Sequence, residues 1–296
     1  MPDGSWLLSG IRSRRACGSL LRLSGPAWWA LHQAPAHETD AGALAAEVRA
    51  AIDEWDRSTV ADRAISALVD AVDSAMYWQP PHEEDVAFGL PEVVEALAPG
   101  ADALAAVAPD WWSAPLDSTT QWFVGWSEPD VPPLSLTGVG ARLAEWRDRA
   151  AAAESQAADW SPGTSSSWWS TPALSSAPFT TRALPGRGAV GLACVEDRFG
   201  WTTARCVPVA PIRPVRIFEV DGPDDWVDLV TRYPFEVTRS RRYDWLRAIG
   251  VEGRWLIPDY PAVARDHDGV HVTARGYLTT SGGAHPVGDG HTTLAG

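Results

Sequence analysis

The residues best suited to chemistry lie in the last third of the chain, between Arg254 and Leu278. Asp259 is followed there by His267, Asp268 and His271. Imidazole changes its charge near neutral pH, and a carboxylate can accept or orient a proton, so histidine beside aspartate is typical of acid–base catalysis. We therefore predict His267, Asp268 and His271 as candidate catalytic residues.

The same stretch has two alternative interpretations. Two histidines four residues apart bind zinc on one helix, but Gly269, Val270 and Val272 predict a strand here, which excludes the helical metal pair. A mixed histidine and carboxylate site for iron, manganese or zinc remains open, and we assign no metal and no cofactor. Alternatively, Asp268 and Gly269 form a tight turn and His271 is an exposed strand residue.

A run of arginines follows a predicted helix at Arg239, Arg241 and Arg242. The guanidinium group binds phosphate and carboxylate groups through paired hydrogen bonds. We predict that this run, together with Asp259, binds a small anionic or nucleotide-like ligand. The alternative is that these arginines form ion pairs with acidic residues of the N-terminal half.

The chain contains 17 tryptophans, among them the adjacent Trp168 and Trp169. Indole rings stack on flat ligands and attract cations, so Trp168 and Trp169 are predicted to line the ligand site. Packing in the hydrophobic core is the alternative role for most of the tryptophans.

All 24 basic residues are arginine, so the chain has no lysine. This excludes an internal Schiff base for pyridoxal chemistry, the P-loop lysine and the phosphate-binding lysine of kinases. The glycine-rich dinucleotide motif, the serine nucleophile elbow and the HExxH metalloprotease motif do not occur either.

Charge is distributed unevenly along the chain. Residues 1–160 carry 24 acidic residues and 10 arginines, whereas residues 161–296 carry 14 of each. An acidic half repels the phosphate backbone, so we expect no nucleic-acid partner. No apolar run is long enough to span a bilayer and no clear signal peptide is present, so we expect a cytoplasmic protein without a membrane partner.

Hydrophobic periodicity predicts helices through most of the first half. The patterns at residues 41–55 and 58–76 predict a helical hairpin, and the proline at 99 predicts two short helices, at residues 91–97 and 101–107. A longer helix is predicted from residue 139 to about residue 159.

The second half is predicted to contain strands and shorter helices. A β-hairpin at residues 189–209, turning at residues 197–200, would place Cys194 and Cys206 on opposite faces, so we expect free thiols. Further strands are predicted at residues 215–220, 255–257 and 270–274, with helices between the first two.

Helices that precede strands predict an α+β fold, with a helical acidic N-terminal half packed on a mixed, mostly antiparallel C-terminal sheet. We predict a Trp-rich half at residues 1–160, an ordered Ser/Pro/Gly-rich crossing at residues 161–188 and an α+β half at residues 189–296. The expected function is binding of a small anionic molecule at the junction of the halves. An interaction module that docks a protein partner on an acidic, Trp-rich face is the alternative.

Overall fold

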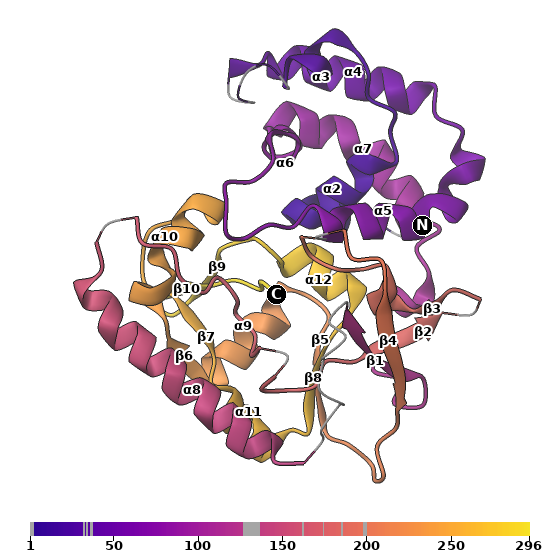
Figure 1. Cartoon of the computed structure of the whole chain (residues 1–296). Helices are drawn as coiled ribbons and strands as arrows, with labels where there is room; N and C mark the ends of the chain where they lie inside the picture. Colours follow the sequence, from indigo (N-terminus) through magenta and orange to yellow (C-terminus); the bar gives the residue numbers. More distant parts are fainter. Residues whose placement is uncertain are drawn as a thin grey trace.

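The structure is a computed structural model, which describes residues 3–31, 33, 35, 38–126, 137–161, 163–173, 175–184, 186–197 and 200–296. Helices α2–α7 lie together at one end of the molecule, and the strands and helices α8–α12 lie at the other (Figure 1). The order of helices and strands confirms the α+β class.

Seven helices come first in the described part of the chain: α1 (Trp6–Ser9), α2 (Ile11–Ser19), α3 (Pro26–Ala30), α4 (Ala41–Asp53), α5 (Val60–Asp73), α6 (Glu83–Ala87) and α7 (Pro91–Ala105). Asp40 caps α4 by accepting hydrogen bonds from the N–H groups of Gly42 and Ala43. The apolar residues that predicted α4, including Leu44 and Val48, are buried as their spacing requires.

Two predictions about these helices are wrong. Helix α4 packs on α7 and α5 packs on α2, so α4 and α5 are not the predicted hairpin. Periodicity shows which face of a helix is buried but not which helix covers it. In addition, α7 is a single helix that contains Pro99, because Leu97 and Leu104 on either side of the proline are both buried in one core. That packing outweighs the cost of a proline inside a helix, about 3 kcal/mol.

The largest sheet has the strand order β3-β2-β1-β4 and is antiparallel throughout. Its strands are β1 (Gln121–Trp126), β2 (Thr181–Leu184), β3 (Gly188–Ala189) and β4 (Ala204–Val209). The predicted hairpin at residues 189–209 is therefore wrong, since β4 pairs with β1 and β3 with β2. The three cysteines are free as expected, although the predicted register was not the reason. Part of the predicted turn, residues 198 and 199, lies outside the described residues.

The remaining strands form three two-stranded ladders: β5 (Ile217–Val220) parallel to β8 (Gly269–Val272), β6 (Pro234–Glu236) antiparallel to β7 (Leu256–Pro258), and β9 (His285–Val287) antiparallel to β10 (Gly290–Thr292). Around them lie α8 (Val139–Gln156), α9 (Pro223–Arg232), α10 (Thr238–Ile249), α11 (Tyr260–Asp266) and α12 (Ala274–Thr280). Helix α8 packs on α10 and α11, so elements from both sides of residue 160 share contacts. The division into residues 1–160, 161–188 and 189–296 stays a prediction.

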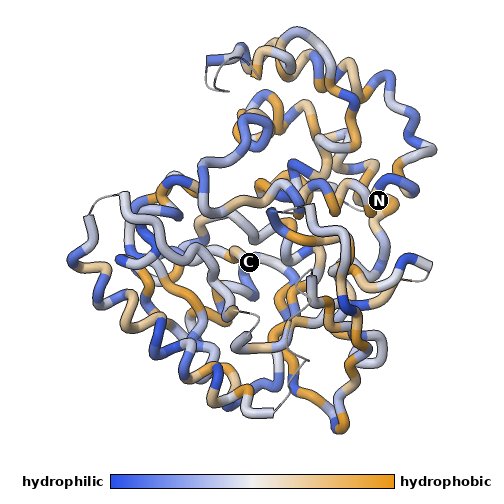
Figure 2. Tube along the Cα trace, in the orientation of Figure 1, coloured by the Kyte–Doolittle hydropathy of each residue, from blue (hydrophilic) through white to orange (hydrophobic). Residues whose placement is uncertain are grey.

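The two ends of the molecule have separate hydrophobic cores. One core lies among the N-terminal helices and includes Leu278 of α12, which ties the two ends together. Another surrounds Trp226 of α9 and Val220 of β5, and a third surrounds Trp245 and Trp255. Figure 2 shows apolar segments in both parts of the molecule.

Within the described residues, no helix combines the length and apolar character needed to cross a membrane.

Candidate functional site

His267 lies directly after α11 and packs as an aromatic ring. Its ring makes edge-to-face contacts with Phe218 and Tyr233, at centroid distances of 5.3 and 6.3 Å. Its Nδ1 atom is buried and forms no hydrogen bond with any described residue. In this conformation His267 has no oriented partner for proton transfer.

Asp268 is held by two arginines. One carboxylate oxygen accepts a hydrogen bond from Arg213 Nη2 at 2.6 Å, and the other accepts one from the Arg216 N–H at 2.9 Å. These hydrogen bonds hold the pKa of Asp268 well below its usual range. A carboxylate so strongly stabilised in its ionised form is a weak base, and its oxygens are already occupied.

Of the two predicted catalytic histidines, His271 is the one whose ring is oriented by a carboxylate. Its Nδ1 atom lies 2.5 Å from Glu219 Oε2, and Glu219 Oε1 accepts the Leu116 N–H at 3.0 Å. Phe218, which contacts His267, precedes Glu219 on β5, so the two side chains point to opposite faces of the strand. His267 and His271 therefore lie on opposite sides of the β5–β8 ladder and do not share a site.

The three arginines of the run lie on α10 and make different contacts. The Arg241 side chain is 3 % exposed, and its Nε donates to the Trp169 carbonyl at 3.4 Å. Burial lowers the pKa of Arg241 to about 10, against the opposing effect of Glu154. Arg241 thus points into the protein, where it packs against the crossing segment.

The other two arginines of the run take different directions. Arg242 is exposed, and its Nη2 donates to the Ala157 and Trp160 carbonyls, each at 3.4 Å. Arg239 is exposed, and its backbone N–H donates to Glu154 Oε1 at 2.8 Å. These contacts join α10 to α8 and its C-terminal end, and the side chains of Arg241 and Arg242 bind carbonyls of different segments.

The remaining predicted ligand residues also make structural contacts. Asp259 caps α11 by accepting the Ala262 N–H at 3.2 Å, and it forms an ion pair with Arg147 at 3.3 Å. The Trp168 carbonyl accepts a hydrogen bond from Trp245 Nε1 at 2.8 Å. The Trp169 ring is 42 % exposed and packs edge-on against Trp168.

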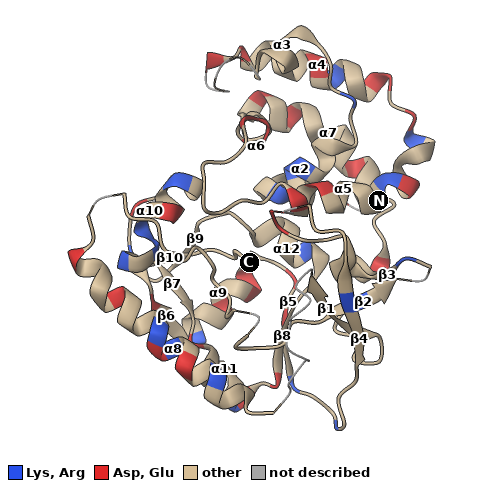
Figure 3. Cartoon of the chain, viewed as in Figure 1, with Lys and Arg blue, Asp and Glu red and all other residues tan. Residues whose placement is uncertain are grey.

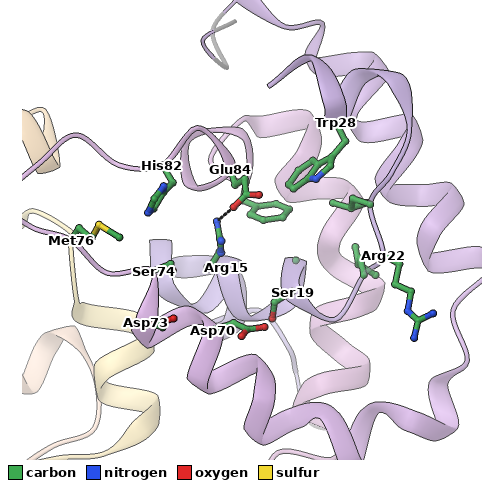
Figure 4. Close-up of a pocket in the computed structure, with 14 residues that line it drawn as sticks. Arg15, Ser19, Arg22, Trp28, Asp70, Asp73, Ser74, Met76, His82 and Glu84 are labelled. Atoms are coloured by element: carbon green, nitrogen blue, oxygen red, sulfur yellow. Dashed lines mark ion pairs between the residues drawn. The ribbon is translucent and has the colours of Figure 1, made fainter. Parts of the chain in front are cut away.

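A cavity of about 460 Å³ lies elsewhere, among α2, α5, α6 and α3, and none of the predicted site residues lines it (Figure 4). Its walls are formed by Arg15, Gly18, Ser19, Leu21, Arg22, Leu23, Trp28, Asp70, Asp73, Ser74, Met76, His82, Glu84 and Phe88. A volume of this size is typical of small-molecule sites.

Ion pairs from α2 hold the cavity walls in place. Arg12 binds Asp85 at 2.6 Å, with both side chains buried, and donates to Ser74 Oγ at 2.8 Å. Arg15 forms an ion pair with Glu84, drawn as a dashed line in Figure 4. Since α2, α5 and α6 are fixed to one another by these contacts, the cavity is formed without a ligand.

Two aromatic rings form one wall. Phe88 lies directly on Gly18, where a Cβ atom would stand 2.0 Å from its ring, so only glycine fits there. Trp28 packs on Phe88 at a centroid distance of 5.2 Å. Glu47 of α4 accepts the Trp28 N–H at 2.9 Å and so fixes the start of α3, which carries the indole.

Asp70 and Asp73, near the end of α5, lie on the opposite side of the cavity from Trp28 (Figure 4). The Asp70 carboxylate accepts no hydrogen bond from the residues that the structure describes. Burial raises its pKa, an effect that the nearby Arg15 only partly offsets. Asp70 is exposed, so its carboxylate can be reached by water or by a ligand in the cavity.

This site was missed by sequence reasoning. Asp70 and Asp73 are three residues apart on a strongly amphipathic helix, which is a local signal that they share a face. In contrast, the pairing of Arg12 with an aspartate 73 residues later leaves no local pattern. The sequence shows several arginines near the N-terminus, including Arg12 and Arg15, but it does not show which acidic residues they pair with.

Among the described residues, no group of three or more His, Cys, Asp or Glu side chains could hold a metal ion. Comparison of the chain with protein-family models, with curated proteins and with solved structures found no match.

Proposed function

We propose that this protein binds a small organic molecule in the cavity among α2, α3, α5 and α6. The observation that carries the proposal is the cavity of about 460 Å³, which has an aromatic wall and, at its edge, the exposed carboxylate of Asp70, which accepts no hydrogen bond from the described residues. Ligand sites combine apolar and aromatic walls with a few polar groups that orient the ligand.

The cavity has better support than the anion site expected at the junction. That hypothesis requires the arginines of the run to converge, whereas the side chains of Arg241 and Arg242 bind carbonyls of different segments. The interaction module has less support as well, because the described tryptophans that are more than a third exposed, Trp29, Trp169 and Trp201, come from separate segments of the chain.

Filling the cavity tests the proposal. Ser19 lines the cavity and is partly exposed, so Ser19→Trp would place an indole in the ligand volume. Ligands that wild type selects from a fragment library, detected by saturation-transfer NMR, should be lost in Ser19→Trp. The matched control is Ser66→Trp, on the exposed side of α5 and outside the cavity lining. If a folded Ser19→Trp protein retained the same ligands, the cavity would not be their site.

A further inference from the structure

We infer that residues 190–197 form a proton-operated latch between the two ends of the molecule, with Glu196 as its switch. When Glu196 carries a proton, the segment stays closed against α12. Loss of the proton releases the segment and exposes Cys194. No residue of the segment lines the cavity, so this inference does not depend on the proposed function.

The segment contacts both the four-stranded sheet and the helical end of the molecule. At its start, the Gly191 N–H donates to Thr181 Oγ1 of β2 at 3.0 Å. Cys194 packs against the core of the N-terminal helices. Trp78, which follows α5, donates from its Nε1 atom to Asp197 Oδ2 at 2.7 Å. The segment therefore bridges two parts of the fold through a small number of contacts. Figure 3 shows that the acidic and basic positions of these parts belong to different elements.

Glu196 ties the same segment to α12. Its Oε1 atom accepts a hydrogen bond from the Tyr277 hydroxyl at 2.6 Å, and its Oε2 atom accepts one from the Gly296 N–H at 3.0 Å. The Tyr277 ring packs against two hydrophobic cores, that of the N-terminal helices and that around Trp226. Glu196 thus binds the side chain that contacts both ends of the molecule.

Asp197 ends the segment in an unfavourable backbone conformation. Its φ is 47°, and among the described residues it is the only non-glycine residue with a positive φ. The left-handed region costs free energy for a residue with a side chain, so the contacts on either side of Asp197 must hold it there. A segment held in this way by a few hydrogen bonds opens locally when one of its contacts is weakened.

The groups that face Glu196 compensate a negative charge only in part. Arg12 of α2 attracts the charge, but an aspartate of α6 already binds Arg12 at 2.6 Å. Asp197 adds a second carboxyl group from the segment itself. Tyr277 of α12 and Tyr77, which follows α5, contribute phenol groups that stay neutral, because burial raises the pKa of both.

Burial therefore raises the pKa of Glu196 from 4.5 to about 7, although the hydrogen bond from Tyr277 opposes the rise. In the open form the carboxyl group reaches water and regains its ordinary pKa. The closed form thus binds the proton more tightly than the open form. The resulting stabilisation of the closed form is complete below about pH 4.5 and is lost as the pH rises through about 7.

Modification of the cysteines by methyl methanethiosulfonate, followed at each site by peptide mass spectrometry, tests the latch. Cys194 lies in the segment, Cys17 is buried among the N-terminal helices, and Cys206 lies on β4. Rates in wild type are divided by those in Glu196→Gln at the same pH, so that the ordinary ionisation of the thiols cancels. We expect the ratio for Cys194 to rise at least about tenfold between pH 5.5 and 8, because only wild type gains a charge that favours opening. The ratios for Cys17 and Cys206 should stay constant.

Two further variants sharpen the assignment to Glu196. Tyr277→Phe removes a hydroxyl group that stabilises the ionised carboxyl group, so the pKa of Glu196 in the closed form should rise further. The increase in Cys194 modification should then continue to a higher pH than in wild type. Glu252→Gln, which removes an exposed carboxyl group outside the segment, is the matched control and should follow wild type.

A Cys194 ratio that does not change with pH would overturn the latch. Equal increases at Cys194 and Cys17 would overturn it as well, because they would mean that the whole protein unfolds. If Glu196→Gln does not fold, the rates in wild type alone decide the question: modification of Cys194 relative to Cys206 must rise with pH, and a constant ratio rejects the inference.

Discussion

Arg12 and Arg213 each contact an aspartate at 2.6 Å, but they lie in regions of very different exposure. The side chains of Arg12 and Asp85 are 4 % and 1 % exposed, whereas those of Arg213 and Asp268 are 62 % and 16 % exposed. Water screens the interaction of Arg213 with Asp268, whereas Arg12 and Asp85 interact in the protein interior, where the effective dielectric constant is lower. Equal distances therefore correspond to unequal energies.

The two regions also differ in which carboxylates already accept hydrogen bonds from the protein. Beside the β5–β8 ladder, both carboxylate oxygens of Asp268 accept hydrogen bonds, from Arg213 and from Arg216. The aspartate that the sequence predicted to be catalytic is therefore already engaged. In the helical part, Arg12 and Arg15 are used on α6 and the end of α5, which leaves Asp70 facing a cavity. A cluster of polar residues in the sequence is thus a poorer guide to a ligand site than a polar residue whose neighbouring arginines bind other groups.

Breaking the buried pair should have the largest effect. Arg12→Ala leaves the buried Asp85 with only the more distant Arg15, at 3.6 Å, so we expect the free energy of unfolding to fall by about 3–5 kcal/mol. Arg213→Ala removes an exposed pair and should cost less than about 1 kcal/mol. Urea unfolding, followed by tryptophan fluorescence, measures both.

The double variant Arg12→Met, Asp85→Leu is the control, because replacing both members of a buried pair by apolar residues is often close to neutral. It should recover most of the stability that Arg12→Ala loses. A loss below about 1 kcal/mol in Arg12→Ala, no larger than the exposed-pair value, would remove the energetic distinction between the two regions.

Glu196 lies where the two regions meet, and its protonation gives the next largest effect. Its carboxyl group accepts hydrogen bonds from the Tyr277 hydroxyl at 2.6 Å and the Gly296 N–H at 3.0 Å. Burial raises its pKa from 4.5 to about 7, although Tyr277 and Arg12 oppose the rise. Because the folded protein holds this proton more tightly than the unfolded chain, the stabilisation is complete below about pH 4.5 and is lost as the pH rises through about 7.

Over that range the free energy of unfolding should fall by up to about 3 kcal/mol from Glu196, at about 1.4 kcal/mol per pH unit. Glu196→Gln cannot titrate, so the difference in stability between wild type and variant should change between pH 4.5 and 7.5 in urea unfolding. A difference that stays constant with pH would show that Glu196 does not couple protonation to folding.

Local patterns predicted much of the fold. Proline at the first position of α9, followed by two acidic residues, is a local signal for a helix start, and the apolar spacing of Leu44 and Val48 predicted α4. The partners of these elements were not predictable in the same way. The strand at residues 204–209 pairs with β1, whose residues lie 78 to 88 positions earlier, where a hairpin with its neighbour was the simpler expectation.

The candidate site was less predictable than the fold, for a related reason. Whether Asp70 or Asp268 is free to bind a ligand depends on which arginines reach it, and those arginines come from distant segments. Sequence spacing shows that polar residues are near one another in the chain. It does not show whether their hydrogen-bonding capacity is already used.

The His271–Glu219 pair of the ladder should give the smallest effect and the sharpest test of independence between the regions. Both side chains are partly exposed, at 23 % and 35 %, so Glu219→Gln should lower the free energy of unfolding by less than about 1 kcal/mol. The variant keeps an amide oxygen that can accept the Leu116 N–H, which limits the loss further. Because neither residue lines the cavity, binding of the fragments that wild type selects should not change in saturation-transfer NMR. If Glu219→Gln abolished fragment binding as Ser19→Trp is expected to do, the ladder and the cavity would be energetically coupled, and the two regions would not be independent.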